Sequence, residues 1–282
     1  MDGMVLIDAA SFIMGSDRFY REEGPAHPRE VDSYWIDARP VTNRQFTEFV
    51  HATGYVTVAE RPVRLLEGDQ APGSLVFTPT AYPVDLSDWR QWWRWVPGAC
   101  WRAPEGPGSD IADKLDHPVV HVAYDDAAAY AHWAGKRLPT EAEHEYASGA
   151  GTTTAFAWGD EPHLDGRLMA NWWQGEFPYN NKGAIGWVGT SPVASFPPGR
   201  HGLFDTIGNV WEWTSDMFAG HGEQAPLRGL PLHSSLRTRV LKGGSFLCAP
   251  QYCLRFRPAA RSSQAPDSSA SHIGFRCART PE

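Results

Sequence analysis

Two long stretches of the chain, residues 58–120 and 155–218, show neither helical nor strand periodicity and are rich in glycine, proline and aromatic residues. Five tryptophans fall within residues 89–101, at Trp89, Trp92, Trp93, Trp95 and Trp101. With 27 glycines and 23 prolines in 282 residues, turns interrupt every long run that could form a helix or strand. We therefore expect an α+β fold of short strands and few helices, rich in irregular structure.

The tryptophan-rich stretch allows two interpretations. Large aromatic side chains usually fill a core, because burying them removes much apolar surface from water. The second interpretation is that this stretch forms one wall of a cleft that binds a peptide.

Composition limits the class of protein. No change in composition and no repeat divides the chain, so we expect one domain over residues 1–282. The net charge of −8 leaves no basic surface for phosphates, which argues against nucleic acid as a partner. No apolar run approaches the ~20 residues that span a bilayer, and residues 1–8 lack the features of a signal peptide. The expected protein is cytoplasmic and has no membrane partner.

Local signals predict the main elements. Thr42 or Asn43 can cap a helix that ends at Gly54, and Thr140 with Glu143 forms a capping box for another helix. Between them we expect a strand over His117–Tyr124 and a helix capped by Asp125 or Asp126 that stops at Gly135. Further expected segments are a strand over 31–37, loops over 16–29 and 219–238, and a strand from 239 to 246.

Four histidines in this region invite a metal interpretation: His117, His121, His132 and His144. Their spacings match no common metal motif. We therefore expect them to be structural.

Two of the four cysteines, Cys248 and Cys253, lie five positions apart. A redox disulfide would be unusual, because the spacing is wider than Cys-x-x-Cys. A zinc site would need two further ligands, and Cys100 and Cys277 are isolated. Two thiolates alone can hold Cu(I), a soft ion. Two inert buried thiols remain the fourth interpretation.

The surroundings of these cysteines resemble the C-terminal signature of the formylglycine-generating enzymes, the sulfatase-modifying factor family. The segments that carry this resemblance are KGGSFLC over 242–248, CLRFRPAAR over 253–261 and PDSSASHIGFRC over 266–277. Runs typical of the broader superfamily agree, including HPVVH over 117–121, KRLPTEAE over 136–143 and GNVWEW over 208–213. The similarity spans nearly the whole chain, and residues 85–97 resemble the actinobacterial members most.

The resemblance implies a variant C-type-lectin-like fold and an enzyme. Such an enzyme oxidises the cysteine of a Cys-x-Pro-x-Arg motif in an unfolded sulfatase to Cα-formylglycine, using O₂ and Cu(I). By position, Cys248 and Cys253 match the copper ligands. Ser245 and Trp211 match residues beside the copper.

The resemblance also implies two structural calcium sites. Asp205, Gly208, Val210 and Glu212 match the first of them completely. The second matches at Asn171, Trp172 and Trp187, but Ile185 stands where the family has a carboxylate. Because Ca²⁺ needs anionic oxygen ligands, we expect the second site to be weakened or empty.

Other positions depart from the family pattern. Secreted members carry two disulfides, and three of those four positions are Ala131, Ser148 and Pro258, which leaves Cys277 alone. This supports a reducing compartment. Pro40 and Gly73 stand where the family has acids that bind the motif arginine, and His144 replaces a tryptophan.

Two other functions share this fold. The first is a non-catalytic, lectin-like binding module, which would have no reason to keep the paired cysteines. The second is an iron-dependent sulfoxide synthase, which carries an additional histidine-bearing helical domain that we do not expect here.

Overall fold

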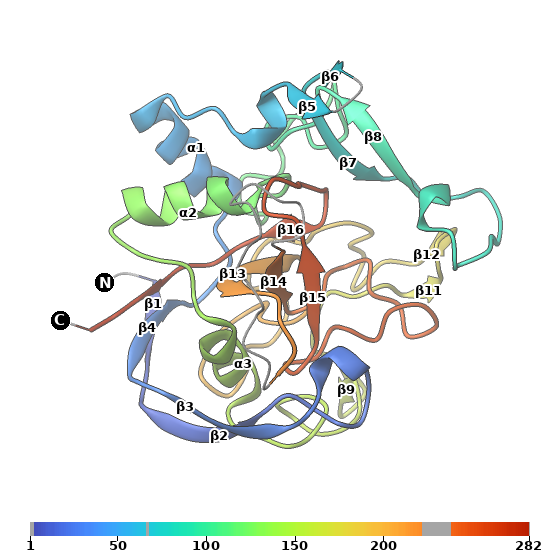
Figure 1. The fold of residues 1–282 in the computed structure, drawn as a ribbon. Coiled ribbons are helices and arrows are strands. Elements are labelled where there is room, and N and C mark those ends of the chain that lie inside the picture. Colours follow the sequence, from blue (N-terminus) through green and yellow to red (C-terminus); the bar gives the residue numbers. More distant parts are fainter. Residues whose placement is uncertain (1–2, 66–67, 222–237, 282) are drawn as a thin grey trace.

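The computed structural model describes residues 3–65, 68–221 and 238–281. Its central sheet has the order β15-β14-β13-β16. The strands are β13 (Trp211–Met217), β14 (Arg239–Lys242), β15 (Arg261–Gln264) and β16 (Ile273–Gly274). β14 pairs antiparallel with both β13 and β15, and β16 runs parallel to β13 (Figure 1). The connection from β14 to β15 contains both predicted copper ligands.

A second sheet joins the two ends of the chain. Its order is β1-β4-β17, with β1 (Met4–Ile7), β4 (Tyr34–Asp37) and β17 (Ala278–Arg279). Both outer strands pair antiparallel with β4, so the termini lie near each other on one side of the molecule (Figure 1).

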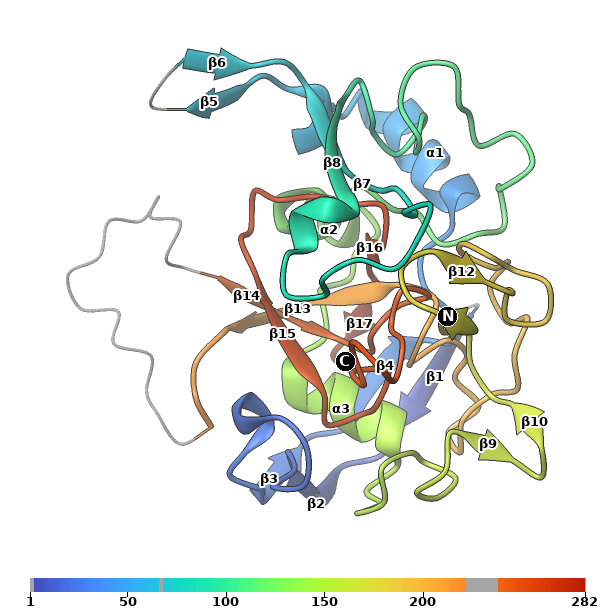
Figure 2. The same cartoon turned by 90° about the vertical axis from the view of Figure 1, so that its right-hand side faces the viewer.

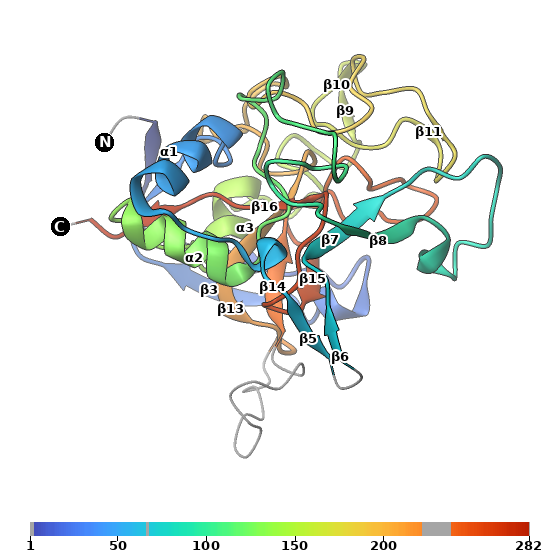
Figure 3. The ribbon, with the colours of Figure 1, turned by 90° about the horizontal axis from the view of Figure 1, so that it is seen from above.

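Three α-helices are present in the described residues: α1 (Asn43–Thr53), α2 (Tyr124–Trp133) and α3 (Glu141–Gly149). The predicted starts of α1 and α3 are confirmed, because Thr42 and Thr140 form capping boxes with Gln45 and Glu143. Gly54 ends α1 in the left-handed conformation, at φ 67°. Figure 3 shows α1 and α2 side by side. Phe49 on α1 and Tyr130 on α2 join them, with ring centroids 5.5 Å apart.

The strand predicted over His117–Tyr124 is wrong. Its backbone donates to two different segments, from Val119 to Val41 and from His121 to Ala270. His121 adopts the left-handed conformation, at φ 59°, which interrupts any continuous ladder. The predicted cap of α2 also needs correction. Ala123 is the N-cap residue, and its N–H donates to the Asp126 carboxylate at 2.8 Å.

Five two-stranded antiparallel sheets complete the described part of the fold. They pair β2 (Ala10–Met14) with β3 (His27–Val31), β5 (Val63–Leu65) with β6 (Gly68–Gln70), β7 (Gly73–Phe77) with β8 (Trp93–Pro97), β9 (His163–Leu164) with β10 (Arg167–Leu168), and β11 (Gly175–Glu176) with β12 (Asn180–Asn181). Figure 2 shows β5 and β6 extending away from the central sheet.

Several expected boundaries differ from those observed. The strand expected over 31–37 is divided, because β3 ends at Val31 and β4 begins at Tyr34. The region 58–120 contains two hairpins and two short 3₁₀ helices, η2 (Val58–Glu60) and η3 (Trp89–Gln91). The loop expected over 16–29 contains the 3₁₀ helix η1 (Arg21–Glu23) and the start of β3. The strand expected over 239–246 ends at Lys242, and most of the loop expected over 219–238 lies outside the described residues.

The largest hydrophobic cluster lies between α1, α2 and the central sheet. Phe46, Trp101, Tyr130, Trp213 and Phe275 are among its members, each at most 5% exposed. A separate aromatic cluster, which contains Trp92, Trp173 and Phe177, packs beside the cysteine segment. Because both clusters are rigidly packed, they give the irregular connections a fixed support.

Candidate active site

The connection from β14 to β15 begins with two glycines that bring it back against its own far end. Gly243 and Gly244 have φ values of 90° and 71°, in the region that glycine favours. A Cβ on Gly244 would lie 2.6 Å from the backbone oxygen of Arg255, so a larger residue would push the two ends of the connection apart. The Gly-Gly pair is therefore what allows a compact loop around the cysteines.

Cys248 and Cys253 face each other without forming a bond. Their sulfurs are 3.2 Å apart, whereas a disulfide measures ~2.05 Å. Both are free thiols; Cys248 is buried and Cys253 is partly exposed. The backbone N–H of Cys248 donates to Ser245 O at 2.9 Å, and that of Cys253 donates to Ala249 O at 2.6 Å. Local turns thus bring the two sulfurs together.

All four predicted site residues line one cavity of about 230 Å³: Trp211, Ser245, Cys248 and Cys253. Trp211 comes from β13, and the other three come from the loop that follows β14. Ser245 is fully buried, and its Oγ accepts a hydrogen bond from the N–H of Leu247 at 3.2 Å. The structure therefore brings these residues together, and their roles in the reaction stay predictions.

The electrostatic surroundings of the two thiols differ. The hydrogen bond with Cys248 lowers the pKa of Cys253 to about 7, and the nearby charge of Arg255 acts in the same direction. Burial raises the pKa of Cys248 well above its usual value. Cys253 is therefore the thiol that ionises first, on the side of the cavity where Arg255 lies.

The tryptophan-rich stretch lies partly in the core and partly at the thiol cavity. Trp92 and Trp101 are each only 1% exposed and fill the core, whereas Trp89 is 52% exposed. Trp93 lines the thiol cavity and packs against His272, with ring centroids 4.7 Å apart. His272 was not among the predicted site residues; it also lines the cavity, and its Nδ1 is buried without a partner. Burial lowers the pKa of His272 to about 3, so its ring is neutral.

The first predicted calcium set has mixed geometry. Asp205 is buried, its Oδ1 has no hydrogen-bond partner among the described residues, and burial raises its pKa to about 6. The negative charge of Glu212 is balanced by an ion pair with Arg276. Arg276 Nε lies 2.6 Å from Glu212 Oε2, and Arg276 Nη2 lies 2.8 Å from Glu212 Oε1. Glu212 therefore does not fit the role of a free calcium ligand.

His144, the departure that the sequence left unexplained, contacts the same carboxylate. Its Nε2 lies 3.0 Å from Glu212 Oε2, and both side chains are 1% exposed. Burial lowers the pKa of His144, so the imidazole is neutral and donates its Nε2 hydrogen to Glu212. His144 is thus part of the buried Glu212–Arg276 network.

The second predicted calcium set offers no carboxylate. The amide of Asn171 donates to Gly189 O at 2.9 Å, and Trp172 stacks on Phe256 with centroids 4.8 Å apart. Ile185 is 62% exposed and Trp187 is 38% exposed. Within residues 3–65, 68–221 and 238–281, no group of three or more His, Cys, Asp or Glu side chains could hold a metal ion.

Comparison with known proteins places the chain in a family. The model of the sulfatase-modifying factor enzyme 1-like domain matches residues 1–281. The chain belongs to the family of formylglycine-generating enzymes. The resemblance found in the sequence is thereby confirmed, as are the single-domain α+β fold and the enzyme class.

Individual relatives support this assignment. The chain is 57% identical to the formylglycine-generating enzyme of Mycobacterium tuberculosis, over 99% of this chain and 98% of the relative. It is also 39% identical to the inactive Cα-formylglycine-generating enzyme 2 of Mus musculus, over 98% of this chain and 87% of the relative. Because an inactive protein is this similar, overall identity cannot replace the chemistry of the site.

A solved structure shares the architecture. PvdO from Pseudomonas aeruginosa matches with a TM-score of 0.66 and 26% identity, over 99% of this chain and 94% of that chain.

Among the described residues, no helix is long and apolar enough to cross a membrane.

Proposed function

We propose that this protein converts the cysteine of a Cys-x-Pro-x-Arg motif in unfolded sulfatases to Cα-formylglycine, with O₂ as the oxidant and Cu(I) as the cofactor. The observation that carries the proposal is the pair of free thiols, Cys248 and Cys253, whose sulfurs lie 3.2 Å apart in a cavity shared with Ser245 and Trp211. A non-catalytic lectin-like module, the alternative, has no use for such a pair.

The donor atoms fit copper. Cu(I) prefers thiolate sulfur, and the two thiols have no third histidine, cysteine or carboxylate grouped with them in the described part of the chain. A site with two protein sulfurs leaves room for a third sulfur, that of the substrate cysteine. A bound Cu(I) ion would supply the electron-transfer chemistry with O₂ that amino-acid side chains lack.

The protein's own residues then bind and orient the reactants. Trp93 and Trp211 form apolar walls of the cavity, which limits the access of water to the two thiols. Arg255 lies in the cavity and favours the ionised form of Cys253, the form that binds a metal. We assign Ser245 to the rim of this site, where its buried hydroxyl lies within the same cavity.

The motif arginine binds outside this cavity. None of the described residues that line the cavity is acidic, and Arg255 would repel a second guanidinium. The family's acid at the position of Gly73 cannot be restored here without strain, because a Cβ on Gly73 would lie 2.5 Å from the backbone oxygen of Val96. We therefore propose weaker selection for the motif arginine than for the cysteine.

We also propose a calcium ion at Asp205, bound by fewer protein ligands than the resemblance implies. Asp205 Oδ1 is unpaired and buried, and the backbone carbonyls of Gly208 and Val210 are the further ligands that the resemblance implies. Glu212 is excluded from this set because Arg276 neutralises it. We propose no ion at Asn171, Trp172 and Trp187, since Ile185 replaces the anionic ligand.

We also propose a reducing compartment, the cytoplasm. Cys277 is buried as a free thiol, and Ala131, Ser148 and Pro258 offer it no disulfide partner.

The experiment incubates the purified protein with Cu(I), O₂ and a Cys-x-Pro-x-Arg peptide, and follows the conversion of thiol to aldehyde by mass spectrometry. Wild type should give product, and Cys253→Ser should not. Cys100→Ser is the matched control, because Cys100 does not line the thiol cavity. Absence of product with wild type, or equal product with Cys253→Ser, would overturn the proposal.

A further inference from the structure

Leu254, which directly follows Cys253, is held by side chains rather than by a strand or helix. Residues 250–259 have no helix or strand, so no ladder fixes their position. The N–H of Leu254 donates to the hydroxyl of Tyr20 at 2.9 Å. The carbonyl of Leu254 accepts a hydrogen bond from Arg257 Nε at 2.7 Å. Both polar groups of the residue beside Cys253 are therefore anchored.

One of these anchors, Tyr20, and the carboxylate that holds the other anchor, Glu23, come from one short segment, residues 19–23, which we call the N-terminal clamp. Glu23 binds Arg257 through two contacts, Oε1 to Nη2 at 2.6 Å and Oε2 to Nη1 at 3.0 Å. The side chains of this pair are at most 1% exposed. Because a bidentate buried pair has one geometry, it fixes the direction of the Arg257 side chain that holds Leu254.

Aromatic rings and a second ion pair complete the clamp. The guanidinium of Arg257 lies 3.7 Å from the ring centroid of Phe19, and that of Arg255 lies 3.8 Å from the ring centroid of Tyr20. Glu22 Oε1 lies 2.5 Å from Arg255 Nη2. Both arginines that follow Cys253 are thus held by residues more than 230 positions away in the chain.

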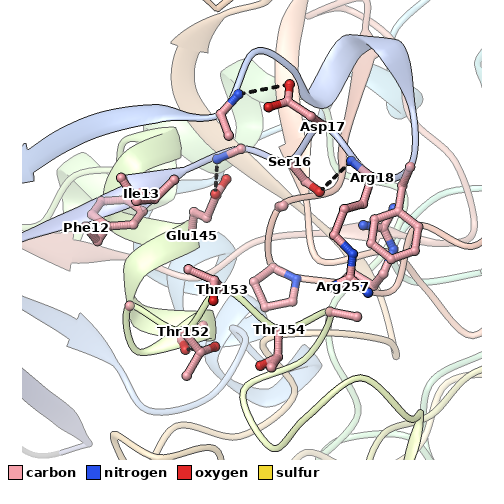
Figure 4. Close-up of a pocket in the computed structure, with 18 residues that line it drawn as sticks. Phe12, Ile13, Ser16, Asp17, Arg18, Glu145, Thr152, Thr153, Thr154 and Arg257 are labelled. Atoms are coloured by element: carbon pink, nitrogen blue, oxygen red, sulfur yellow. Dashed lines mark hydrogen bonds between the residues drawn. The ribbon is translucent and has the colours of Figure 1, made fainter.

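The clamp is linked through Glu145 of α3 to the strand that leads into the cysteine segment. Ser16 N–H donates to Glu23 O at 3.0 Å, and Gly15 N–H donates to Glu145 Oε1 at 2.6 Å. The other carboxylate oxygen of Glu145 lies 2.7 Å from Lys242 Nζ, at the end of β14. Figure 4 shows Glu145 and Arg257 on the walls of one cavity, with Ser16 and Arg18 from the neighbouring segment.

The two cysteines are therefore fixed in different ways. Cys248 is held within the core by backbone contacts, from its N–H to Ser245 O and from Trp173 N–H to its own carbonyl at 3.0 Å. The N–H of Cys253 donates to Ala249 O, and the Cys253 thiol is hydrogen-bonded by Arg255, whose side chain the clamp holds. A change in the clamp should loosen Cys253 and leave Cys248 in place.

We propose that Tyr20, Glu22 and Glu23 are positioning residues that hold Cys253 opposite Cys248. Their importance for catalysis rests on the proposed role of Cys253 as a copper ligand, whereas the positioning itself is a property of the metal-free protein. They act as side chains behind a ligand usually do, by restricting its orientation.

The test measures alkylation of each cysteine by iodoacetamide in the metal-free protein, with peptide mapping by mass spectrometry. Tyr20→Phe removes one hydroxyl and keeps the ring. With each rate expressed per thiolate, because the hydrogen bond with Cys248 favours ionisation of Cys253, we expect Cys253 to react about fivefold faster, the factor that corresponds to one lost hydrogen bond. The reaction of Cys248 should not change. Glu22→Gln, which removes the charge that holds Arg255, should have the same effect.

Asp160→Asn is the matched control. Asp160 pairs with Arg18, beside the clamp, but this ion pair is exposed and does not touch residues 253–257. Alkylation of Cys253 in this variant should equal that of wild type. The inference is overturned if Tyr20→Phe and Glu22→Gln leave Cys253 unchanged. It is equally overturned if both cysteines accelerate together, or if Asp160→Asn has the same effect.

A second measurement separates positioning from the proposed function. Competition with a Cu(I) chelator gives the affinity of each variant for Cu(I) alone. Tyr20→Phe should bind Cu(I) about fivefold more weakly than wild type, in line with its faster alkylation. If wild type binds no Cu(I), the proposed function fails while the alkylation result still decides the positioning role.

Discussion

Glu212 and Arg276 form a bidentate ion pair in the interior, with contacts of 2.6 and 2.8 Å and side chains no more than 1% exposed. Although burial opposes ionisation, the charge of Arg276 and the hydrogen bond with His144 lower the pKa of Glu212. A residue that resembles a calcium ligand in the sequence is thus part of a buried charge network that links the central sheet to the segment before β17.

Removing one partner of this pair should destabilise the protein strongly. Arg276→Met leaves a buried carboxylate without its cation, so we expect the free energy of unfolding to fall by about 3–5 kcal/mol. Urea denaturation measures the change. Asp116→Asn, which breaks the exposed pair with Arg44, should change it by less than about 1 kcal/mol. Equal losses in the two variants would contradict a buried network.

Substitutions at two tryptophans of β13 should have different effects, one on activity and the other on stability. Trp211 lines the thiol cavity, so Trp211→Phe should lower the rate of peptide oxidation by roughly tenfold to a hundredfold through poorer positioning. Trp213 is outside that lining, and its Nε1 donates to Val122 O at 2.9 Å. Trp213→Phe should keep the rate per folded molecule and lower stability by about 1–3 kcal/mol, because it leaves a buried carbonyl unpaired. The rate of peptide oxidation and the free energy of unfolding, measured for both variants, check this prediction. A lower rate in Trp213→Phe together with an unchanged rate in Trp211→Phe would refute it.

We predict that Ca²⁺ binding requires the ionised carboxylate of Asp205. We expect added Ca²⁺ to raise the melting temperature of wild type at pH 7.5, and to raise it less at pH 5, where Asp205 with a pKa of about 6 is protonated. Asp205→Asn should abolish the effect at both pH values. Differential scanning calorimetry with Ca²⁺ or EDTA measures it. A stabilisation by Ca²⁺ that persists in Asp205→Asn would place the ion elsewhere.

His121 should make the protein sensitive to acid. It is fully buried, its Nδ1 and Nε2 contact Ser74 Oγ and Pro104 O, each at 2.8 Å, and burial lowers its pKa to about 4. Because the unfolded chain binds a proton at its usual pKa, near 6.5, and the folded chain does not, stability is full above that pH. It then falls toward pH 4, by an amount on the order of 3 kcal/mol.

His121→Asn tests this linkage, since asparagine tolerates the left-handed backbone at this position. Urea denaturation should show a gap in stability between wild type and the variant at pH 7.5 that narrows by pH 4. A gap that stays constant over this range would mean that His121 does not titrate as stated.

The functional segment was predictable because its information is local. The pairing of Cys248 with Cys253 could be singled out from their spacing and from the residues around them, although the strand predicted over 239–246 extended past the turn at Gly243 and Gly244. The capping boxes at Thr42 and Thr140 are local in the same way, and they placed α1 and α3 correctly.

The predictions of secondary structure were wrong where partners that are distant in sequence determine the backbone conformation. The segment over His117–Tyr124 has apolar residues that favour a strand, but it donates to Val41 and to Ala270, which belong to different parts of the fold. No local pattern reports such shared bonding. The ion pair of Glu212 could not be predicted for a related reason, because Arg276 is 64 residues away in sequence and no local pattern identifies it as the partner.

The sequence by itself determined the family and the pair of cysteines, since these depend on residue identity and short spacing. Only the tertiary structure decided how Cys253 is held. Tyr20, Glu22 and Glu23 lie in what reads as an ordinary charged loop, and they reach Leu254, Arg255 and Arg257 only after β14, α3 and the N-terminal segment have packed together. Ion pairs and hydrogen bonds across such distances are consequences of folding, because the chain must first bury these groups before each one needs its partner.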